Sequence, residues 1–332
     1  MEKNNGKEYI IALDLGKHAG KAIGRAIDDS SEDIKKVKIR TKIKVLGENE
    51  FVEIGTNSYD LIYNKKNIII GEQGEEIEDN FKSNKISPLH KYIAYGIITR
   101  FLKPNTTDNK IKIVLACPIP ALRVKESKEK YKQLIKGDGP INLEVNGEKF
   151  EFEVTDIMVK AEDSCIMYTP ELNGVDNVGI IGFGGLNMNF LLYHKGEFVF
   201  RKSYDHGAKA LETFIKDSLT VMKGGELPKE YELNMALEKG HTVDRGKIVE
   251  ESIEAVKDAK KNFLEEAQIM LLKDKQDINV LEKLCFIGGT SIKLKDQITD
   301  LYSNVVNFKN DEDLQMAAVE GLYRVAVKKY LK

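Results

Sequence analysis

Residues 9–24, YIIALDLGKHAGKAIG, constrain the fold more than any other part of this 332-residue chain. The segment opens with five consecutive apolar residues, a run that is typical of a strand buried on both faces. Asp14 stands where this strand should end, and a glycine-containing turn and a second apolar segment follow it. We therefore predict a strand, a turn and a second strand, with turn N–H groups that could form an anion site.

The side chains of this turn suit it to phosphate and metal chemistry. The Asp14 carboxylate could hold a hydrated Mg²⁺, and the Lys21 ammonium group could reach a phosphate. Taken alone, a hairpin with a polar tip explains the segment equally well. Repetition favours a site, because a second glycine turn follows a strand near residue 182 and a third follows a strand near residue 288.

Charge and cysteine content narrow the class of protein. The chain has 51 basic and 53 acidic side chains and a net charge of −2, so a nucleic-acid-binding field is not indicated. Cys117, Cys165 and Cys285 lie far apart in apolar surroundings, which predicts buried free thiols in a reducing cytoplasm. The polar N-terminus lacks the apolar core of a signal peptide, and no apolar run is long enough to span a membrane.

Strand and helix patterns alternate along the chain in an order that occurs twice. The predicted strands lie within residues 34–70 (FVEIG at 51–55 included), 111–117, 141–159, 178–193, 283–287 and, as VVNF, 305–308. The predicted helices cover residues 88–102, 125–135, 208–222, 230–272 with a break near Gly240, 292–301 and 313–331, with a short one in 161–172. Such an order indicates a duplicated α/β unit.

The duplication predicts an α/β fold of two domains. The first would cover residues 1–172, with a sheet-rich insertion at about 34–105. The second would cover residues 173–332, with a helical insertion at about 208–275. A cleft between the two halves would collect all three glycine turns.

The three turns and their order resemble the ATPase fold shared by actin, DnaK-type chaperones and sugar kinases. The first phosphate loop would be residues 14–21, the second residues 180–190, and the adenosine motif residues 286–294. Within this superfamily the chain is similar to the bacterial actin-like plasmid-segregation proteins of the ParM family. The GGLN turn, the segment VKAEDS before the second loop and the ending DLQMAAVEGLY carry that likeness.

The resemblance implies roles for individual residues. Asp14 would hold the hydration shell of Mg²⁺ and serve catalysis, and Glu162 would orient the attacking water. A capping role at the start of a short helix explains Glu162 equally well. The residues implied in nucleotide binding are Asp14, Gly16, Lys17, Lys21, Gly184, Gly185, Leu186, Asn187, Gly288, Gly289 and Thr290.

Those binding residues fall into groups by the part of the nucleotide they would contact. Lys21 is a better phosphate ligand than Lys17, because it matches the family's position. Backbone N–H groups of residues 184–186 would cradle the γ-phosphate. The glycines at 288 and 289 would let the backbone approach the adenosine closely, although a plain strand-to-helix turn needs them too. Residues 259–266 would add a purine contact, with no single residue indicated.

One departure from the family pattern bears on the chemistry. The family usually has an Asp at the start of the second turn, in a D-x-G-G pattern, and Gly182 holds that place here. Asn189 likewise stands where an acid is common. Without this carboxylate, the metal affinity and the hydrolysis rate do not follow from the resemblance. The backbone N–H cradle for the γ-phosphate is unaffected, because it needs no side chain.

The resemblance implies an actin-like, nucleotide-dependent ATPase that assembles into filaments and drives plasmid DNA segregation. ATP or GTP with Mg²⁺ would favour the polymerising conformer, and hydrolysis would weaken the subunit contacts. A DNA-bound adaptor of ParR type would capture filament ends, so the filament itself is not expected to bind nucleic acid or membrane.

Three other functions stay open at this point. A small-molecule kinase of the same superfamily would need a carboxylate base and a substrate-binding insertion. A chaperone would carry a peptide-binding domain beyond the ATPase core, and this chain stops after its last predicted helix. A nucleotide-binding scaffold that does not hydrolyse its ligand is compatible with Gly182.

Overall fold

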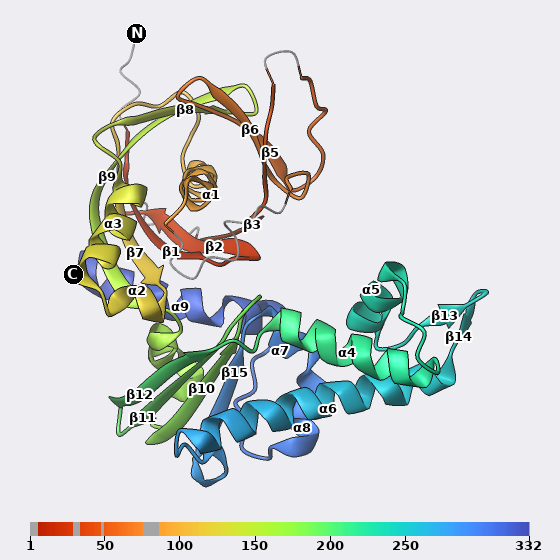
Figure 1. The fold of residues 1–332 in the computed structure, drawn as a ribbon. Helices are drawn as coiled ribbons and strands as arrows, with labels where there is room; N and C mark the ends of the chain where they lie inside the picture. Colours follow the sequence, from red (N-terminus) through yellow and green to blue (C-terminus); the bar gives the residue numbers. More distant parts are fainter. Residues whose placement is uncertain (1–5, 29–33, 48–49, 76–85, 332) are drawn as a thin grey trace. The chain divides into compact units, whose positions relative to one another are not determined.

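The computed structural model describes residues 6–28, 34–47, 50–75 and 86–331, which divide into two compact units (Figure 1). The first unit contains the chain up to Pro170 together with the segment from Met316 onward, and the second contains Glu171 to Gln315. The first five residues of the polar N-terminus, and part of the predicted sheet-rich insertion, lie outside the described residues. Across the described ranges, no helix combines the length and the apolar character needed to cross a bilayer.

The described part of the first unit is built on a nine-stranded sheet in the order β3-β2-β1-β7-β9-β8-β5-β6-β4. Strand β7 runs parallel to β1 on one side and to β9 on the other. The strands are β1 (Glu8–Leu15), β2 (Ala19–Ala26), β3 (Lys35–Arg40), β4 (Ile43–Val45), β5 (Ser58–Tyr63), β6 (Lys66–Gly71), β7 (Asn109–Cys117), β8 (Ile141–Val145) and β9 (Glu148–Ala161). The carboxyl ends of β1, β7 and β9 therefore share one edge of the sheet.

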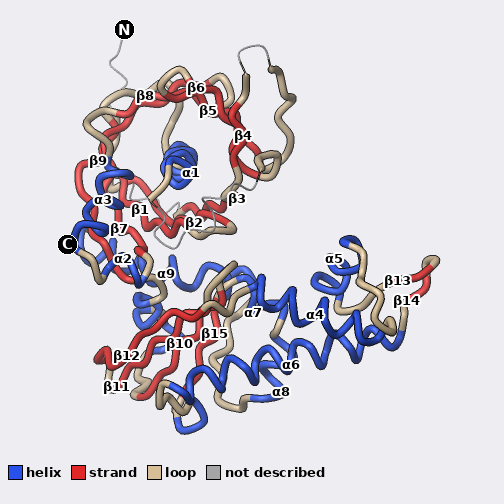
Figure 2. The backbone as a smooth tube through the Cα atoms, in the orientation of Figure 1, coloured by secondary structure: helices blue, strands red, loops and turns tan. Residues whose placement is uncertain are grey.

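The sheet curls around helix α1 (Pro88–Thr99), which Figures 1 and 2 show inside the ring of strands. Glycines allow this close approach: a Cβ at Gly20 would lie 2.7 Å from the Ile93 side chain, and one at Gly96 would lie 2.2 Å from Ile70. Strands β4, β5 and β6 extend the same sheet through β8. Helix α3 (Lys125–Lys136), which follows the short α2 (Ile119–Leu122), buries its apolar side chains in the core around α1.

Helix α9 (Asp311–Tyr330) covers the other face of β1 and β7. Its apolar side chains pack with Ile10, Ala12 and Val114, which alternate with the residues that face α1. From the sequence this helix is expected in the second domain, whereas the structure packs its residues from Met316 onward with the first unit. The reason is that β1 and β7 are apolar on both faces and need a cover on each.

The second unit contains, among its described residues, a four-stranded sheet in the order β12-β11-β10-β15, with β10 parallel to β15. Helices α4 and α6 pack together against this sheet. The elements are β10 (Asn177–Phe183), β11 (Met188–His194), β12 (Glu197–Tyr204), α4 (Ala208–Met222), α5 (Glu230–Lys239), β13 (Val243–Asp244), β14 (Lys247–Ile248), α6 (Glu250–Lys273), β15 (Lys283–Ile287), α7 (Gly289–Lys293) and α8 (Lys295–Leu301).

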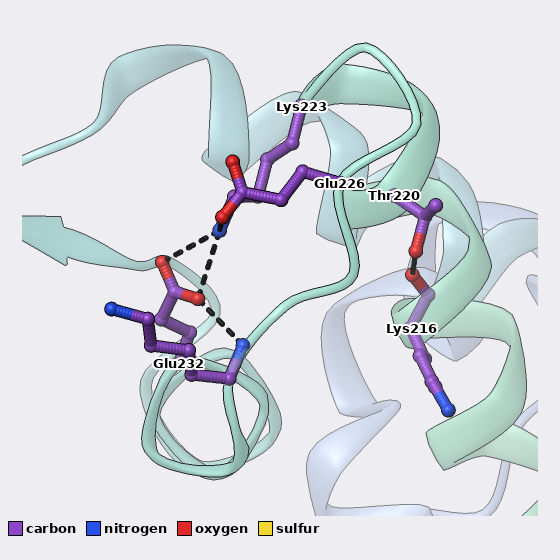
Figure 3. A network of polar contacts seen from close by, with 6 residues as sticks. Lys216, Thr220, Lys223, Glu226 and Glu232 are labelled. Carbon is purple, nitrogen blue, oxygen red and sulfur yellow. Dashed lines mark hydrogen bonds and ion pairs between the residues drawn. The ribbon is translucent and has the colours of Figure 1, made fainter.

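A polar network fixes the connection between α4 and α5 (Figure 3). The Glu232 carboxylate accepts hydrogen bonds from Lys223 Nζ at 2.9 and 3.1 Å and from the backbone N–H of Lys229 at 2.7 Å. The same carboxylate thus caps the first turn of α5 and holds the last turn of α4. The break in the predicted helical stretch falls at Gly240, which ends α5 with φ +77°.

Some predicted strands do not form as expected, and the causes are local. The alternating run after residue 34 breaks into β3 and β4, which pair with different strands: β3 with β2, and β4 with β6. Residues 51–55 form no strand. VVNF contributes only an isolated bridge between Val305 and Leu284. The short helix expected after β9 is present as two 3₁₀ turns, η2 (Ser164–Tyr168) and η3 (Pro170–Leu172).

The packing of α9 makes Gly321→Ala a test of its position. A Cβ at residue 321 would lie 2.1 Å from the Cys165 carbonyl oxygen, and backbone cannot move aside cheaply. Overpacking of this kind costs about 1–3 kcal/mol, which exceeds the roughly 1 kcal/mol that alanine gains over glycine inside a helix. We expect a lower midpoint of thermal unfolding. Arg324→Ala, at an exposed position of the same helix, should leave it nearly unchanged. A Gly321→Ala midpoint at or above the parent value would contradict this packing.

Candidate functional site

Asp14 and Lys21 occupy directly opposite positions on β1 and β2. The strand register pairs Asp14 with Lys21, and pairs Lys21 in turn with Lys38 of β3. Opposite residues of an antiparallel pair share one face of the sheet, with Cβ atoms about 5 Å apart. A carboxylate and an ammonium group therefore lie side by side near the ends of these strands.

The turn between β1 and β2 is fixed from outside by Thr41. Its hydroxyl donates to the Gly16 carbonyl at 2.6 Å, and its backbone N–H donates to the carbonyl two residues further on. A Cβ at Gly16 would lie 2.6 Å from the Ala19 carbonyl oxygen, so glycine is required there. Lys17 in this turn is half-buried and His18 is exposed. The role of Thr41 escapes sequence analysis, because it depends on β3 lying beside β2.

Glu162 lies at the same edge of the sheet as Asp14, directly after β9. Its backbone N–H donates to the Cys117 carbonyl at 3.0 Å, one step past the end of the parallel pairing. Strand β7 separates β9 from β1, which places the two backbones about 10 Å apart. Since η2 begins at Ser164 after a cap at Asp163, Glu162 stands before the cap position. Ligands of α/β sheets bind beyond the carboxyl ends of such strands.

Tyr131 of α3 is a further polar group at this edge, and sequence analysis missed it. Its side chain is fully buried, and its hydroxyl has no hydrogen-bond partner within the described part of the chain. Burial raises the pKa of Tyr131 well above its ordinary value, and the nearby charges of Glu162 and then Asp14 raise it further. The charges of both candidate carboxylates thus act on one buried hydroxyl.

In the second unit, residues 184–187 form a tight loop between β10 and β11 that rests on α4. The N–H of Gly184 donates to the Asn187 carbonyl at 2.8 Å. The first N–H groups of α4, from Ala208 and Lys209, donate to the carbonyls of Gly184 and Gly185 at 2.9 and 3.0 Å. The helix therefore holds the loop in one conformation. Gly185, Leu186 and Asn187 are each half-buried, and the Asn187 amide donates to Ser203 Oγ at 3.3 Å.

The third glycine turn lies against this loop, since β15 pairs with β10. Gly288 has φ +94°, and a Cβ there would lie 2.4 Å from the Phe183 carbonyl oxygen. The Thr290 hydroxyl donates to the Gly184 carbonyl at 3.4 Å. Gly182 is buried in β10 between its strand partners Asn189 and Ile287. The two turns expected to share one ligand are thus neighbours in space.

Beside Gly289 lies a cavity of about 750 Å³ among α5, α6, α7 and α8, a size that suits a small-molecule ligand. Burial lowers the pKa of Lys260 on its wall, while the carboxylate of Asp296 acts in the opposite direction. Lys260 is the member of the 259–266 stretch that lines this cavity. The lining residues are Leu237, Glu238, Lys239, Gly240, Ile253, Val256, Lys257, Lys260, Gly289, Ile292, Lys293, Asp296, Gln297, Asp300 and Gln315.

The donor groups fit Mg²⁺ better than a transition metal. No group of three His, Cys, Asp or Glu side chains within the described ranges could form a metal cage. Mg²⁺ keeps several water ligands and needs only one or two carboxylates besides phosphate oxygens, which Asp14 and its neighbours could supply.

The three cysteines are buried free thiols, as predicted, and burial raises the pKa of Cys165 to about 11.

Two α/β units with glycine turns at the ends of parallel strands define the class of actin-fold proteins. The sequence family described as the N-terminal domain of actin-like proteins matches residues 12–162. The Alp12 filament structure is 38% identical, with 98% of this chain and 99% of that chain covered at a TM-score of 0.72. No curated sequence matches the chain. The chain belongs to the actin-like protein family.

More distant structures share the fold. A 15-stranded ParM filament from Clostridium botulinum is 16% identical, covers 97% of this chain and 99% of that chain, and has a TM-score of 0.69. Ta0583, an archaeal actin homologue, is also 16% identical, covers 96% and 99%, and has a TM-score of 0.75. The archaeal protein has also been solved in complex with ADP. The actin-like fold expected from the sequence is thereby confirmed.

The third turn yields a matched pair of substitutions. Gly288→Ala should lower the midpoint of thermal unfolding, because a left-handed φ costs an alanine about 1–3 kcal/mol and its Cβ would meet the backbone of Phe183. Gly289→Ala is the control, since its Cβ would meet only the flexible end of Gln315 at 3.3 Å and its φ is ordinary. Equal midpoints for the two variants would contradict the close approach of this turn to β10.

Proposed function

We propose that this chain is a nucleotide-dependent protein that forms filaments and segregates plasmid DNA. The observation that carries the proposal is the likeness to the Alp12 filament subunit, which extends over 98% of the chain at 38% identity. An identity at this level over the whole length supports shared surfaces as well as a shared fold. The glycine turns and the cavity support nucleotide as the ligand.

The residues of the first unit serve the phosphates and the metal in this proposal. Asp14 holds Mg²⁺ through water, and Gly16, Lys17 and Lys21 meet the phosphate oxygens, with Lys21 as the main cation. Bound Mg²⁺ supplies positive charge that offsets the charge of the phosphates. Glu162 accepts a proton from the water that attacks the terminal phosphate and orients that water.

The residues of the second unit serve the terminal phosphate and the adenosine. The Gly184 N–H is used inside its own turn, so the N–H groups of Gly185 and Leu186 form the main cradle, with Asn187 beside them. Gly288, Gly289 and Thr290 allow the backbone to approach the nucleoside. The base occupies the cavity next to Gly289, where Lys260 supplies a polar contact.

Assembly follows from the differential affinity of nucleotide for two conformers. A ligand shifts an equilibrium only by the difference between its affinities for the two states. Triphosphate favours the polymerising form, and its hydrolysis removes that bias. A head-to-tail contact whose rotation does not close generates an open helical filament.

Both ATP and GTP are candidates for the nucleotide. The proposed location is the cytoplasm, because buried free thiols suit a reducing compartment.

The partner outside the filament is a DNA-bound adaptor of ParR type in this proposal. The net charge of −2 on the subunit supports an adaptor, because direct binding to DNA relies on a strong positive field. The filament would then push or pull the adaptor's DNA without contacting the bases itself.

Light scattering tests the assembly. Above a critical protein concentration, scattering should rise when Mg²⁺ and triphosphate are added and should decay as the nucleotide is consumed. Asp14→Ala should abolish the rise, because the metal loses its carboxylate, while the folded chain survives. The control is His18→Ala, which changes an exposed side chain in the same turn. If the chain stays monomeric with ATP, GTP and their analogues but phosphorylates a small molecule, the proposed filament function is wrong and a kinase function takes its place.

Phosphate release tests the role of Glu162. Glu162→Ala should slow release by roughly 10²–10⁴-fold, the contribution of a positioned acid–base group. Filaments should still form and should last longer, because assembly needs bound triphosphate and decay needs hydrolysis. Glu153→Ala, a change on the same strand at the ion pair with Lys110, should keep the parent rate. An unchanged rate for Glu162→Ala would remove Glu162 from the chemistry.

A further inference from the structure

Tyr131 places a hydroxyl group in the core beneath the candidate catalytic edge. The side chain is fully buried on α3, which packs against β9, the strand that ends at Glu162. Within the described residues its hydroxyl has no hydrogen-bond partner. A buried donor without an acceptor costs free energy, and a phenylalanine would fill the same space without that cost. The Tyr95 hydroxyl is buried and unsatisfied in the same way, so what sets Tyr131 apart is its place on α3 against β9.

The surroundings of the hydroxyl indicate what that role is. The charged groups that act on it are the carboxylates of Glu162 and Asp14, and Cys117 also lies near it. The carbonyl of Cys117 accepts the backbone N–H of Glu162, so these residues belong to one short stretch of the edge. Because burial and both carboxylates raise the pKa of Tyr131, the phenol keeps its proton at neutral pH and can act only as a donor toward a carboxylate.

We propose that Tyr131 is a positioning residue for Glu162, whose carboxylate accepts the Tyr131 hydrogen bond in the transition state of hydrolysis. Hydrogen bonds of catalytic groups are often long in the free protein and shorten only in the reacting complex. The bond holds the carboxylate in the orientation in which it accepts a proton from the attacking water. The inference rests on the proposed function, because it assumes that Glu162 performs this step.

Tyr131→Phe removes one oxygen and keeps the ring, so it tests the hydroxyl alone. The turnover number for phosphate release should fall by roughly 10–100-fold, the usual effect of losing a group that orients a catalytic residue. The KM and the affinity for a non-hydrolysable triphosphate analogue with Mg²⁺ should stay within about threefold of the parent values, because ground-state binding does not use the bond.

Tyr95→Phe is the matched control. Tyr95 is equally buried in the same core, and its hydroxyl lies beside Tyr63 and Gly137, away from both carboxylates. Its removal should leave turnover unchanged. The thermal midpoint of the nucleotide-free chain gives a readout that is independent of activity. Tyr131→Phe should not lower this midpoint, whereas a hydroxyl with a purely structural role would lower it and spare the turnover number.

A double-mutant cycle decides whether Tyr131 acts through Glu162. In a Glu162→Ala background, Tyr131→Phe should slow turnover no further, because the carboxylate that it positions is gone. An equal loss in both backgrounds, or a Tyr131→Phe chain that turns over like the parent, would overturn the inference and leave the role of Glu162 intact. If Glu162→Ala alone leaves turnover unchanged, the proposed chemistry fails, and the inference fails with it.

Discussion

The parallel pairing of β7 with β1 and β9 is the interaction on which the first unit depends. Strands β1 and β7 are apolar on both faces, so α1 must cover one side and α9 the other. Parallel pairing also makes the strands end at one edge, which brings Asp14 and Glu162 together although they are far apart in sequence. A slip of one residue in this register would turn their side chains to the opposite face.

Parallel strand pairing also organises the second unit, with fewer strands. The parallel pair of β10 and β15 sets the second and third glycine turns side by side. The backbone at Gly288 therefore lies close to the backbone of Phe183, and this position needs both a left-handed φ and the absence of a Cβ. The loop at residues 184–187 gains its shape from α4, whose first N–H groups take up two loop carbonyls. Backbone geometry therefore sets the shape of both glycine turns.

The features that could be predicted from the sequence are those that a local residue pattern determines. Continuous apolar runs indicated β1, β7, β10 and β15, with a glycine turn after each except β7, which prolines close. The polar ends of the first hairpin indicated Asp14 and Lys21. Thr41, Tyr131 and Lys260 could not be predicted, because each matters only through elements that pack together across long stretches of chain. The same holds for α9, whose helical period was evident and whose partner sheet was not.

The place of Gly182 shows how the fold and the charge of the site are linked. Its φ is ordinary, so the backbone dihedral does not by itself call for glycine there. The position is buried between β11 and β15, where a carboxylate would lose its hydration and need a cation to offset that loss. Glycine removes this cost, and in the proposed function the carboxylate that would hold the metal is Asp14 alone. In the proposed function, nucleotide binding by the second unit would therefore depend on backbone N–H groups and on the cavity around Lys260 rather than on a second carboxylate.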